Sequence, residues 1–300
     1  MKILHTILRP FALEATMKCH GWFQLTPFYW HESPKTLYWA TQFGREEPVL
    51  LKIREIPSAN PAPCTIELEW DGDKNHQDTV IKKVRHVFNL DIDLTGFYHL
   101  AKRHRYLDQI ESRGIGRLMR SESLFEDLFK AICGTNVTWR QAVKMINAIG
   151  ALGPPVPGTE YHVFPNPQAI LEAGEAFLKQ VGRVGYRSAY LVELCHRFLE
   201  SPPLAQQIER GVVPAAEMKK FFLGIKGIGK VTAHYLSALY GDFSELAIDS
   251  LVLSYMTKQH FSGVKPTHQQ IEDFYAPFGE WRYLAYWMEF IVAEGWKPEV

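Results

Sequence analysis

The sequence predicts an α+β fold, with a small antiparallel β-rich domain in residues 1–80 and a mainly α-helical core in residues 81–300. Three observations support this division. Apolar and polar residues alternate in short runs before residue 80, as in strands with one solvated face. After residue 80, apolar residues recur at three- and four-residue spacing, as in amphipathic helices. Proline-rich stretches interrupt the helical pattern and predict connections between helices.

Four runs predict the strands of the N-terminal domain. Each run is short, and proline or glycine residues separate the runs, as expected for strands joined by turns. They are WFQL at 22–25, LYWATQF at 37–43, VLLKIREI at 49–56 and CTIELEW at 64–70. We expect these strands to be antiparallel.

About ten helices are expected after residue 80. The clearest contain apolar residues spaced for one helical face. These residues are Val80, Val84, Val87 and Phe88, then Leu124, Phe125, Leu128, Phe129 and Ile132, then Val143, Ile146 and Ile149. The segments PPVPG at 154–158 and SPPL at 201–204 cannot continue helices, so they are predicted to be connectors.

The composition indicates a soluble protein with a sizeable core and excludes several classes of protein. The chain has 300 residues, 46% of them hydrophobic, and no apolar run near the ~20 residues of a membrane span. The N-terminus does not resemble an export signal, so a cytoplasmic location is expected. The four cysteines lie far apart without a CxxC pair, which argues against a zinc ribbon or disulfide framework. The balance of 33 basic and 33 acidic residues argues against nucleic-acid binding through bulk positive charge.

The most informative segment is LGIKGIGKVTAHY at 223–235, which predicts a helical hairpin over about residues 218–240. A helix that restarts directly after Gly227 and Gly229 leaves its first backbone amides unpaired. Such amides bind phosphate, because glycine lets an oxygen approach and the helix dipole favours an anion. Lys226 and Lys230 flank the hairpin, and residues 218–241 contain no acid. The alternative is an ordinary glycine cap followed by a tight turn.

The hairpin, followed about sixteen residues later by Asp249 in LAIDSLV, resembles the signature of the helix-hairpin-helix DNA glycosylase superfamily. The segment at 274–299, which closes with EGWKP, resembles the last helix of the bacterial DNA-3-methyladenine glycosylase II group. The resemblance covers roughly residues 120–300 and implies a helical glycosylase core. It also implies that Gly227, Gly229, Lys226, Lys230 and Thr232 contact DNA.

Asp249 is the predicted catalytic residue. Cleavage of an N-glycosidic bond develops positive charge on the sugar, which a nearby carboxylate stabilises. The same carboxylate can orient or deprotonate the attacking water. The alternative for Asp249 is a helix N-cap, since Ser250 and an apolar run follow it.

The resemblance also predicts a monofunctional enzyme. Bifunctional relatives place a Schiff-base lysine two residues after the second hairpin glycine, and this chain has Val231 there. Lys230 lies one residue earlier, rotated ~100° on the helix. The four-cysteine iron–sulfur loop of some relatives is absent, because the last cysteine is Cys195. We therefore expect no cofactor and no metal, with room only for a structural monovalent cation at the hairpin.

A flipped base needs a pocket, and the resemblance assigns its lining to Val231, Tyr235 and aromatic residues of the last helix. The aromatic candidates there are Tyr286, Trp287 and Phe290, since electron-rich rings suit a cationic alkylated base. The family pattern has a tryptophan at the position of Val231, so the sequence departs from it there. The alternative for these aromatic residues is packing in the helical core.

Two further segments resemble parts that enter the DNA duplex. In SLFEDLFKAICGTNVTWRQAV at 123–143, Asn136 falls where relatives fill the gap left by the flipped base. In VGYRSAY at 184–190, Tyr186 would enter the base stack and Arg187 would contact the orphan base. Both segments are closer to the 8-oxoguanine glycosylase branch. A turn residue at 136 and a core aromatic at 186 are the alternatives.

The predicted function is a monofunctional DNA glycosylase in base excision repair that removes alkylated purines of the 3-methyladenine type. The alternatives are a glycosylase for oxidised or deaminated purines, such as 8-oxoguanine or hypoxanthine, and a non-catalytic lesion-binding protein. The expected partner is double-stranded DNA with a damaged base, bound by a monomer without membrane contact. The expected location is the bacterial cytoplasm at the nucleoid, or the nucleus if the source is eukaryotic.

Overall fold

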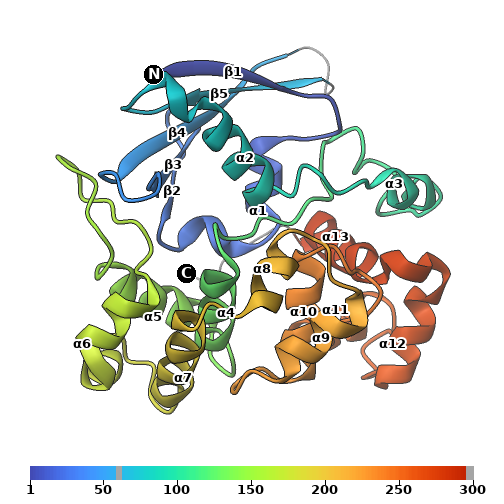
Figure 1. Ribbon diagram of the computed structural model, residues 1–300. Coiled ribbons are helices and arrows are strands. Elements are labelled where there is room, and N and C mark those ends of the chain that lie inside the picture. Colours follow the sequence, from blue (N-terminus) through green and yellow to red (C-terminus); the bar gives the residue numbers. More distant parts are fainter. Residues whose placement is uncertain (59–62, 295–300) are drawn as a thin grey trace.

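The computed structural model describes residues 1–58 and 63–294 and has an α+β architecture, as predicted. Figure 1 shows the sheet at the top of the molecule and most helices below it. The strands are β1 (Lys2–Ile7), β2 (Phe28–His31), β3 (Thr36–Thr41), β4 (Val49–Ile56) and β5 (Cys64–Glu69). The α-helices are α1 (Leu13–Lys18), α2 (Gln77–Val87), α3 (Thr95–Ala101), α4 (Leu124–Cys133), α5 (Trp139–Gly150), α6 (Pro167–Gln180), α7 (Arg187–Leu199), α8 (Pro203–Glu209), α9 (Ala215–Leu223), α10 (Lys230–Leu239), α11 (Ser250–Gln259), α12 (His268–Tyr275) and α13 (Arg282–Glu294). The 3₁₀ helices are η1 (Gly21–Gln24), η2 (Lys74–His76) and η3 (Ala276–Trp281).

The five strands form one antiparallel sheet in the order β1-β5-β4-β3-β2. Its buried face carries Leu51, Ile53, Ile66 and Leu68, and the alternation along β4 and β5 places charged residues on the other face. Three predicted runs therefore correspond to strands β3, β4 and β5. Strands β1 and β2 were not predicted.

The fourth predicted strand, WFQL at 22–25, is wrong, because residues 21–24 form the 3₁₀ helix η1. Trp22 is buried in the hydrophobic cluster of the helices, whereas Phe23 is buried in the cluster of the sheet. The turn therefore directs adjacent apolar side chains into two different hydrophobic clusters. A run of this length cannot be distinguished from a strand by its periodicity alone.

The helical part follows the predicted pattern with two differences. Within the described residues, twelve α-helices, α2 to α13, follow residue 76, against about ten expected. The SPPL segment is not only a connector, because Pro203 and Leu204 open α8, where the fixed φ of proline suits the first turn. The hydrophobic cluster of the sheet continues past residue 80 through α2 to Met119, so the division at residue 80 stays a prediction.

Helix α4 is the centre of the helical part, and all ten of its residues are buried. Its charged residues are nevertheless paired. The Lys130 Nζ lies 2.5 Å from Glu126 Oε1 and 3.2 Å from Ser121 Oγ. Asp127 accepts hydrogen bonds from the Tyr240 hydroxyl and from the Ser121 amide. Burial raises the pKa of the Glu126 carboxyl to about 7, although Lys130 opposes this shift.

No helix among the described residues is long and apolar enough to cross a membrane.

Replacing Lys130 with methionine should destabilise the protein by about 3–5 kcal/mol at about pH 8, because it leaves Glu126 buried without its cation. The loss should be smaller at about pH 5. The raised pKa of Glu126 means that its carboxyl is already neutral there and carries no unpaired charge. Urea unfolding at both pH values measures the difference.

The matched control is Lys179→Met, which removes a lysine from an i,i+4 pair on the surface of α6. Its cost should stay below about 1 kcal/mol at either pH. An equal loss for Lys130→Met at both pH values would contradict the interpretation.

Candidate functional site

The predicted helical hairpin consists of α9, a turn at 224–229 and α10. Gly227 has a φ of +92°, a region that residues with a Cβ rarely adopt. A Cβ at this position would lie 2.7 Å from Cδ2 of the Tyr190 ring. Both constraints require glycine at position 227, and the packing of Tyr190 from α7 against the turn was not predicted.

Gly229 is the N-cap of α10 and has an extended backbone conformation, with a φ of −90° and a ψ of 178°. No side chain caps this end of the helix. The amides at 230–232 are therefore oriented for an outside acceptor, as the geometry of a helix start requires. Lys230 and Val231 are exposed and Thr232 is half-buried. The structure thus brings the predicted phosphate-binding residues to one helix end.

Lys226 extends from the turn beside Tyr190. Its Nζ lies 3.5 Å from a carboxylate oxygen of Glu193 and 5.7 Å from the centre of the Tyr190 ring. Both Lys226 and Glu193 are more than half exposed. An exposed pair of this kind contributes little to stability, so the ammonium group can exchange Glu193 for an external anion.

Asp249 caps helix α11. Its Oδ1 accepts a hydrogen bond of 2.9 Å from the Val252 amide. Part of the side chain reaches solvent, yet burial by the surrounding protein raises the pKa of its carboxyl above the ordinary value. Backbone amides that bond the carboxylate oppose this shift. The predicted alternative role, an N-cap, is confirmed, and it fixes the carboxylate without covering it.

Tyrosines of α13 lie close to Asp249. Burial raises the pKa of Tyr283 and Tyr286, and the negative charge of Asp249 raises both further. The two rings are 5.1 Å apart in an edge-to-face arrangement. Burial also raises the pKa of Tyr235 on α10. Tyr283 therefore packs on the predicted pocket residue Tyr286, and no motif in the sequence marked Tyr283 as part of the site.

The N-terminal segment also contributes to this aromatic cluster. The Tyr235 ring lies 6.2 Å from those of both His20 and Trp22. The Trp287 Nε1 donates a hydrogen bond of 2.9 Å to the Cys19 carbonyl. These contacts join residues more than 200 positions apart in the chain, and no motif in residues 19–22 indicated them. The site is built from both halves of the molecule.

Val231 and Phe290 are the remaining residues predicted to line the pocket. Val231 is 39% exposed and precedes Tyr235 by four residues, so both side chains share one face of α10. Phe290 packs between Trp287, 5.6 Å away, and Tyr255 of α11, 5.4 Å away. The residues at 295–298 of the EGWKP segment lie outside the described residues.

Asn136 lies in the loop between α4 and α5, where its side chain is exposed and its φ is +51°. Asparagine tolerates this left-handed conformation better than most residues. Arg187 stabilises the loop from inside the protein. Its Nε donates a hydrogen bond of 3.1 Å to the Thr135 carbonyl, and its Nη2 donates to the same oxygen. Asn136 is thus presented at the surface in a fixed conformation.

The role predicted for Arg187 is corrected by this geometry. Only 5% of Arg187 is exposed, and its guanidinium also donates to the Val184 carbonyl at 3.3 Å. Its hydrogen bonds are used inside the protein, so it supports the Asn136 loop and does not reach an orphan base. Tyr186, by contrast, is 56% exposed, with its ring 5.8 Å from Tyr190.

Within residues 1–58 and 63–294, no group of three or more His, Cys, Asp or Glu side chains could hold a metal ion. The four cysteines are buried and unpaired. That the chemistry needs no metal or cofactor stays a prediction from the sequence.

Comparisons with known proteins agree with the resemblance in the sequence. No protein-family model matches the chain. It is 26% identical over 215 residues to a DNA-3-methyladenine glycosylase of Bacillus subtilis, covering 70% of each chain. It is 23% identical over 219 residues to a probable N-glycosylase/DNA lyase of Methanothermobacter thermautotrophicus, covering 63% of this chain and 69% of the relative.

Solved structures show the same fold. The 3-methyladenine DNA glycosylase of Archaeoglobus fulgidus matches with a TM-score of 0.75 at 18% identity, over 97% of this chain and 98% of the other. The 8-oxoguanine glycosylase/lyase of Clostridium acetobutylicum, bound to double-stranded DNA, matches with a TM-score of 0.71 at 18% identity, over 96% and 97%. The relatives and structural neighbours are thus named as DNA glycosylases, which agrees with the resemblance in the sequence.

Replacing Gly227 with alanine should destabilise the protein by about 1–3 kcal/mol, because the new Cβ meets the Tyr190 ring in a strained backbone conformation. Replacing Gly229 with alanine should cost less than about 1 kcal/mol, since no atom lies within 4 Å of its Cβ position. Chemical denaturation of both variants measures the difference. Equal losses would show that the contact with Tyr190 is not the cause.

Proposed function

We propose that this chain, a relative of the helix-hairpin-helix DNA glycosylases, releases alkylated purines of the 3-methyladenine type from double-stranded DNA by hydrolysis. The observation that carries the proposal is the placement of Asp249. Its carboxylate is fixed at the start of α11, beside Tyr283 and Tyr286, in surroundings that raise its pKa. The coarser function, an N-glycosylase acting on DNA, also has the support of the relatives.

The reaction needs a negative charge next to the sugar. As the bond between base and sugar breaks, its electrons leave with the base and positive charge develops on the sugar. The Asp249 carboxylate would stabilise this charge, and water would then add to the sugar carbon. The raised pKa of Asp249 favours its acceptance of a proton from that water.

The aromatic cluster suits the base. Tyr235, Tyr286 and Trp287 have electron-rich rings, and the rings of Tyr286 and Trp287 pack edge to face. Such rings attract a cationic alkylated purine. The base would reach them only after leaving the double helix. The exposed hairpin amides would hold a phosphate of the same strand, with Lys226 and Lys230 adding positive charge nearby.

A second candidate is a glycosylase for oxidised purines. It is favoured by the Asn136 loop and by Tyr186, which are exposed as a gap-filling residue and a wedge must be. An oxidised purine is neutral, so the rings would have to read it by stacking and hydrogen bonds without the attraction to a cation.

Duplexes that each carry one 3-methyladenine, 8-oxoguanine or hypoxanthine test the substrate. We expect release of 3-methyladenine at a rate well above that of the other two bases, measured as free base by chromatography. Release of 8-oxoguanine alone would overturn the proposed substrate but leave the glycosylase assignment intact. Release of no base would favour the lesion-binding alternative.

Replacing Asp249 with asparagine should lower the rate of base release by about 10²–10³-fold, because the charge that stabilises the sugar cation is lost. Asparagine is an equally good N-cap, so α11 should remain folded. Affinity for a duplex with an abasic site, measured by fluorescence anisotropy, should stay within about threefold of the parent.

The matched control is Asp242→Asn. Asp242 accepts a hydrogen bond from the Ser244 amide in a turn, which asparagine preserves, and it should retain full activity. Unchanged activity of Asp249→Asn would exclude the catalytic role.

Treatment with borohydride during turnover should trap no covalent adduct between protein and DNA. Val231 shares the pocket face of α10 with Tyr235, whereas Lys230 is rotated ~100° from it. Mass spectrometry of the reaction mixture identifies any adduct. An adduct on Lys230 would show that the enzyme is also a lyase.

A further inference from the structure

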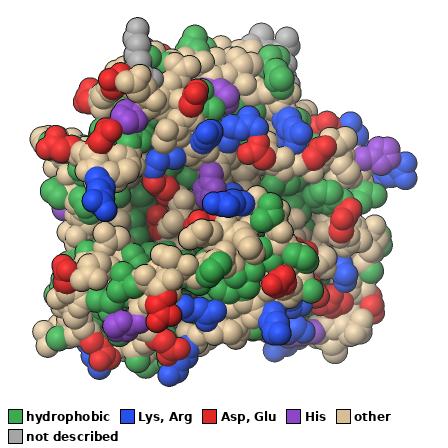
Figure 2. Space-filling model, viewed as in Figure 1, with side chains coloured by type: hydrophobic (Ala, Val, Ile, Leu, Met, Phe, Trp, Pro, Cys, Tyr) green, Lys and Arg blue, Asp and Glu red, His purple; other side chains and the backbone are tan. Residues whose placement is uncertain are grey.

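A cavity of about 320 Å³, separate from the site around Asp249, lies at the N-terminal end of α4. This volume falls in the range of small-molecule pockets. The described residues that line it are Pro27 and residues from three segments, within 122–126, 163–167 and 198–209, and none belongs to the hairpin, α11 or α13. Figure 2 shows that the molecule is hollowed on this face between the sheet half and the helical half.

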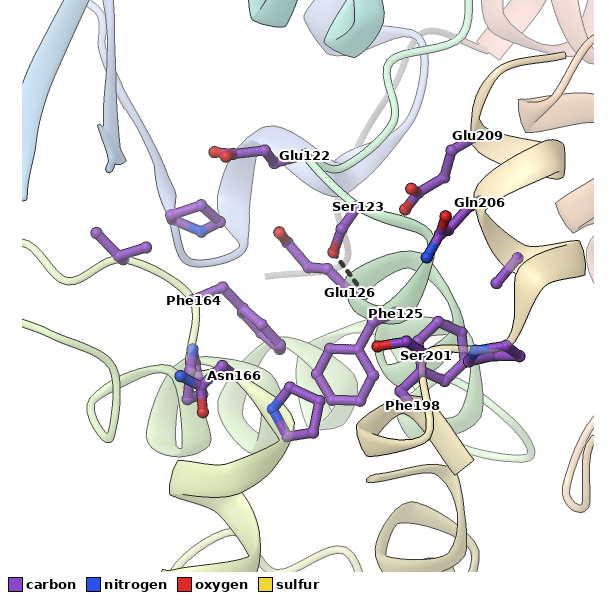
Figure 3. A pocket seen from close by; sticks show the side chains of 16 residues that line it. Glu122, Ser123, Phe125, Glu126, Phe164, Asn166, Phe198, Ser201, Gln206 and Glu209 are labelled. Atoms are coloured by element: carbon purple, nitrogen blue, oxygen red, sulfur yellow. Dashed lines mark hydrogen bonds between the residues drawn. The ribbon is translucent and has the colours of Figure 1, made fainter. Parts of the chain in front are cut away.

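One side of the cavity is aromatic. Figure 3 shows the rings of Phe125, Phe164 and Phe198 along this side. Four prolines and Ala205 add further apolar surface. Phe125 and Phe198 pack with their ring centres 5.4 Å apart, which gives the wall a fixed shape. Such a wall binds the apolar body of an organic molecule favourably, whereas water or a simple ion would make few favourable contacts with it.

The other side carries three carboxylates, those of Glu122, Glu126 and Glu209 (Figure 3). Two of them are neutralised within the protein, since Glu122 pairs with Lys83 and Glu126 with Lys130. Glu209 is different, because among the described residues it has no ion-pair partner, and its Oε1 accepts a hydrogen bond of 2.7 Å from the Leu124 amide. No Lys, Arg or His is among the described residues that line the cavity. The walls therefore present one excess negative charge.

We propose that this cavity binds a small organic monocation, a primary amine on an aromatic or branched apolar body, with its ammonium group on Glu209 and its body against the three phenylalanine rings.

The surroundings of Glu209 agree with this assignment. Burial raises the pKa of Glu209, and the Leu124 amide and Arg120 oppose the shift only in part. A bound ammonium would favour the charged form of the Glu209 carboxyl and so lower its pKa.

Phenethylamine is the probe, with 2-phenylethanol as its neutral counterpart of the same shape. Isothermal titration of the full chain at about pH 8 should show binding of the amine and at least about tenfold weaker binding of the alcohol. Glu209→Gln should weaken binding of the amine about tenfold, while the hydrogen bond from the Leu124 amide is kept. Ala205→Leu should abolish binding by filling the cavity.

The matched control is Glu172→Gln, which removes a carboxylate of α6 that lies outside the cavity and should leave affinity unchanged. Thermal unfolding shows whether each variant is folded. A duplex with an abasic site should not displace the amine, because the cavity lies apart from the hairpin and Asp249. Absence of binding, equal affinity for the alcohol, indifference to Glu209→Gln or displacement by the duplex would each overturn the proposal.

Discussion

The pairing of charges inside α4 is the interaction on which the rest of the structure depends. A helix buried on all sides would normally be apolar, yet α4 carries Glu126, Asp127 and Lys130. Glu126 neutralises Lys130 within the helix, and Lys130 and Asp127 each contact a different part of the fold. Lys130 lies over aromatic rings of the N-terminal segment and of the α5–α6 connection, and Asp127 binds the Tyr240 hydroxyl just after α10. Because an unpaired charge there is costly, the neighbouring elements have only one satisfactory arrangement.

The same constraint assembles the site from distant parts of the chain. Residues 19–22 leave the sheet half and enter the helical cluster beside α4, which brings His20 and Trp22 to the Tyr235 ring. Helix α13 joins this aromatic cluster through the hydrogen bond from Trp287 to the Cys19 carbonyl. Asp249 then lies at the border of an aromatic cluster that neither half forms alone.

Much of this could be predicted from the sequence, and the failures have physical causes. Strand β4 and the hairpin follow from local patterns, because periodicity and glycine spacing are properties of neighbouring residues. The 3₁₀ turn at 21–24 and the role of Tyr283 depend on contacts between distant segments, which leave no local pattern. Arg187 was assigned to DNA because VGYRSAY resembles the wedge segment of the 8-oxoguanine branch, but the hydrogen bonds from Arg187 to Thr135 use its donors inside the protein.

Tyr190 is a single ring shared by three features: Gly227 packs on it, Lys226 lies over it and Tyr186 meets its edge. In the function that we propose, this sharing would link two events. A shift of the hairpin on binding a backbone phosphate would press on the ring that also packs against Tyr186, the residue predicted to enter the base stack. Binding of the strand and entry of Tyr186 would then be coupled through Tyr190, so DNA that resists one would also weaken the other.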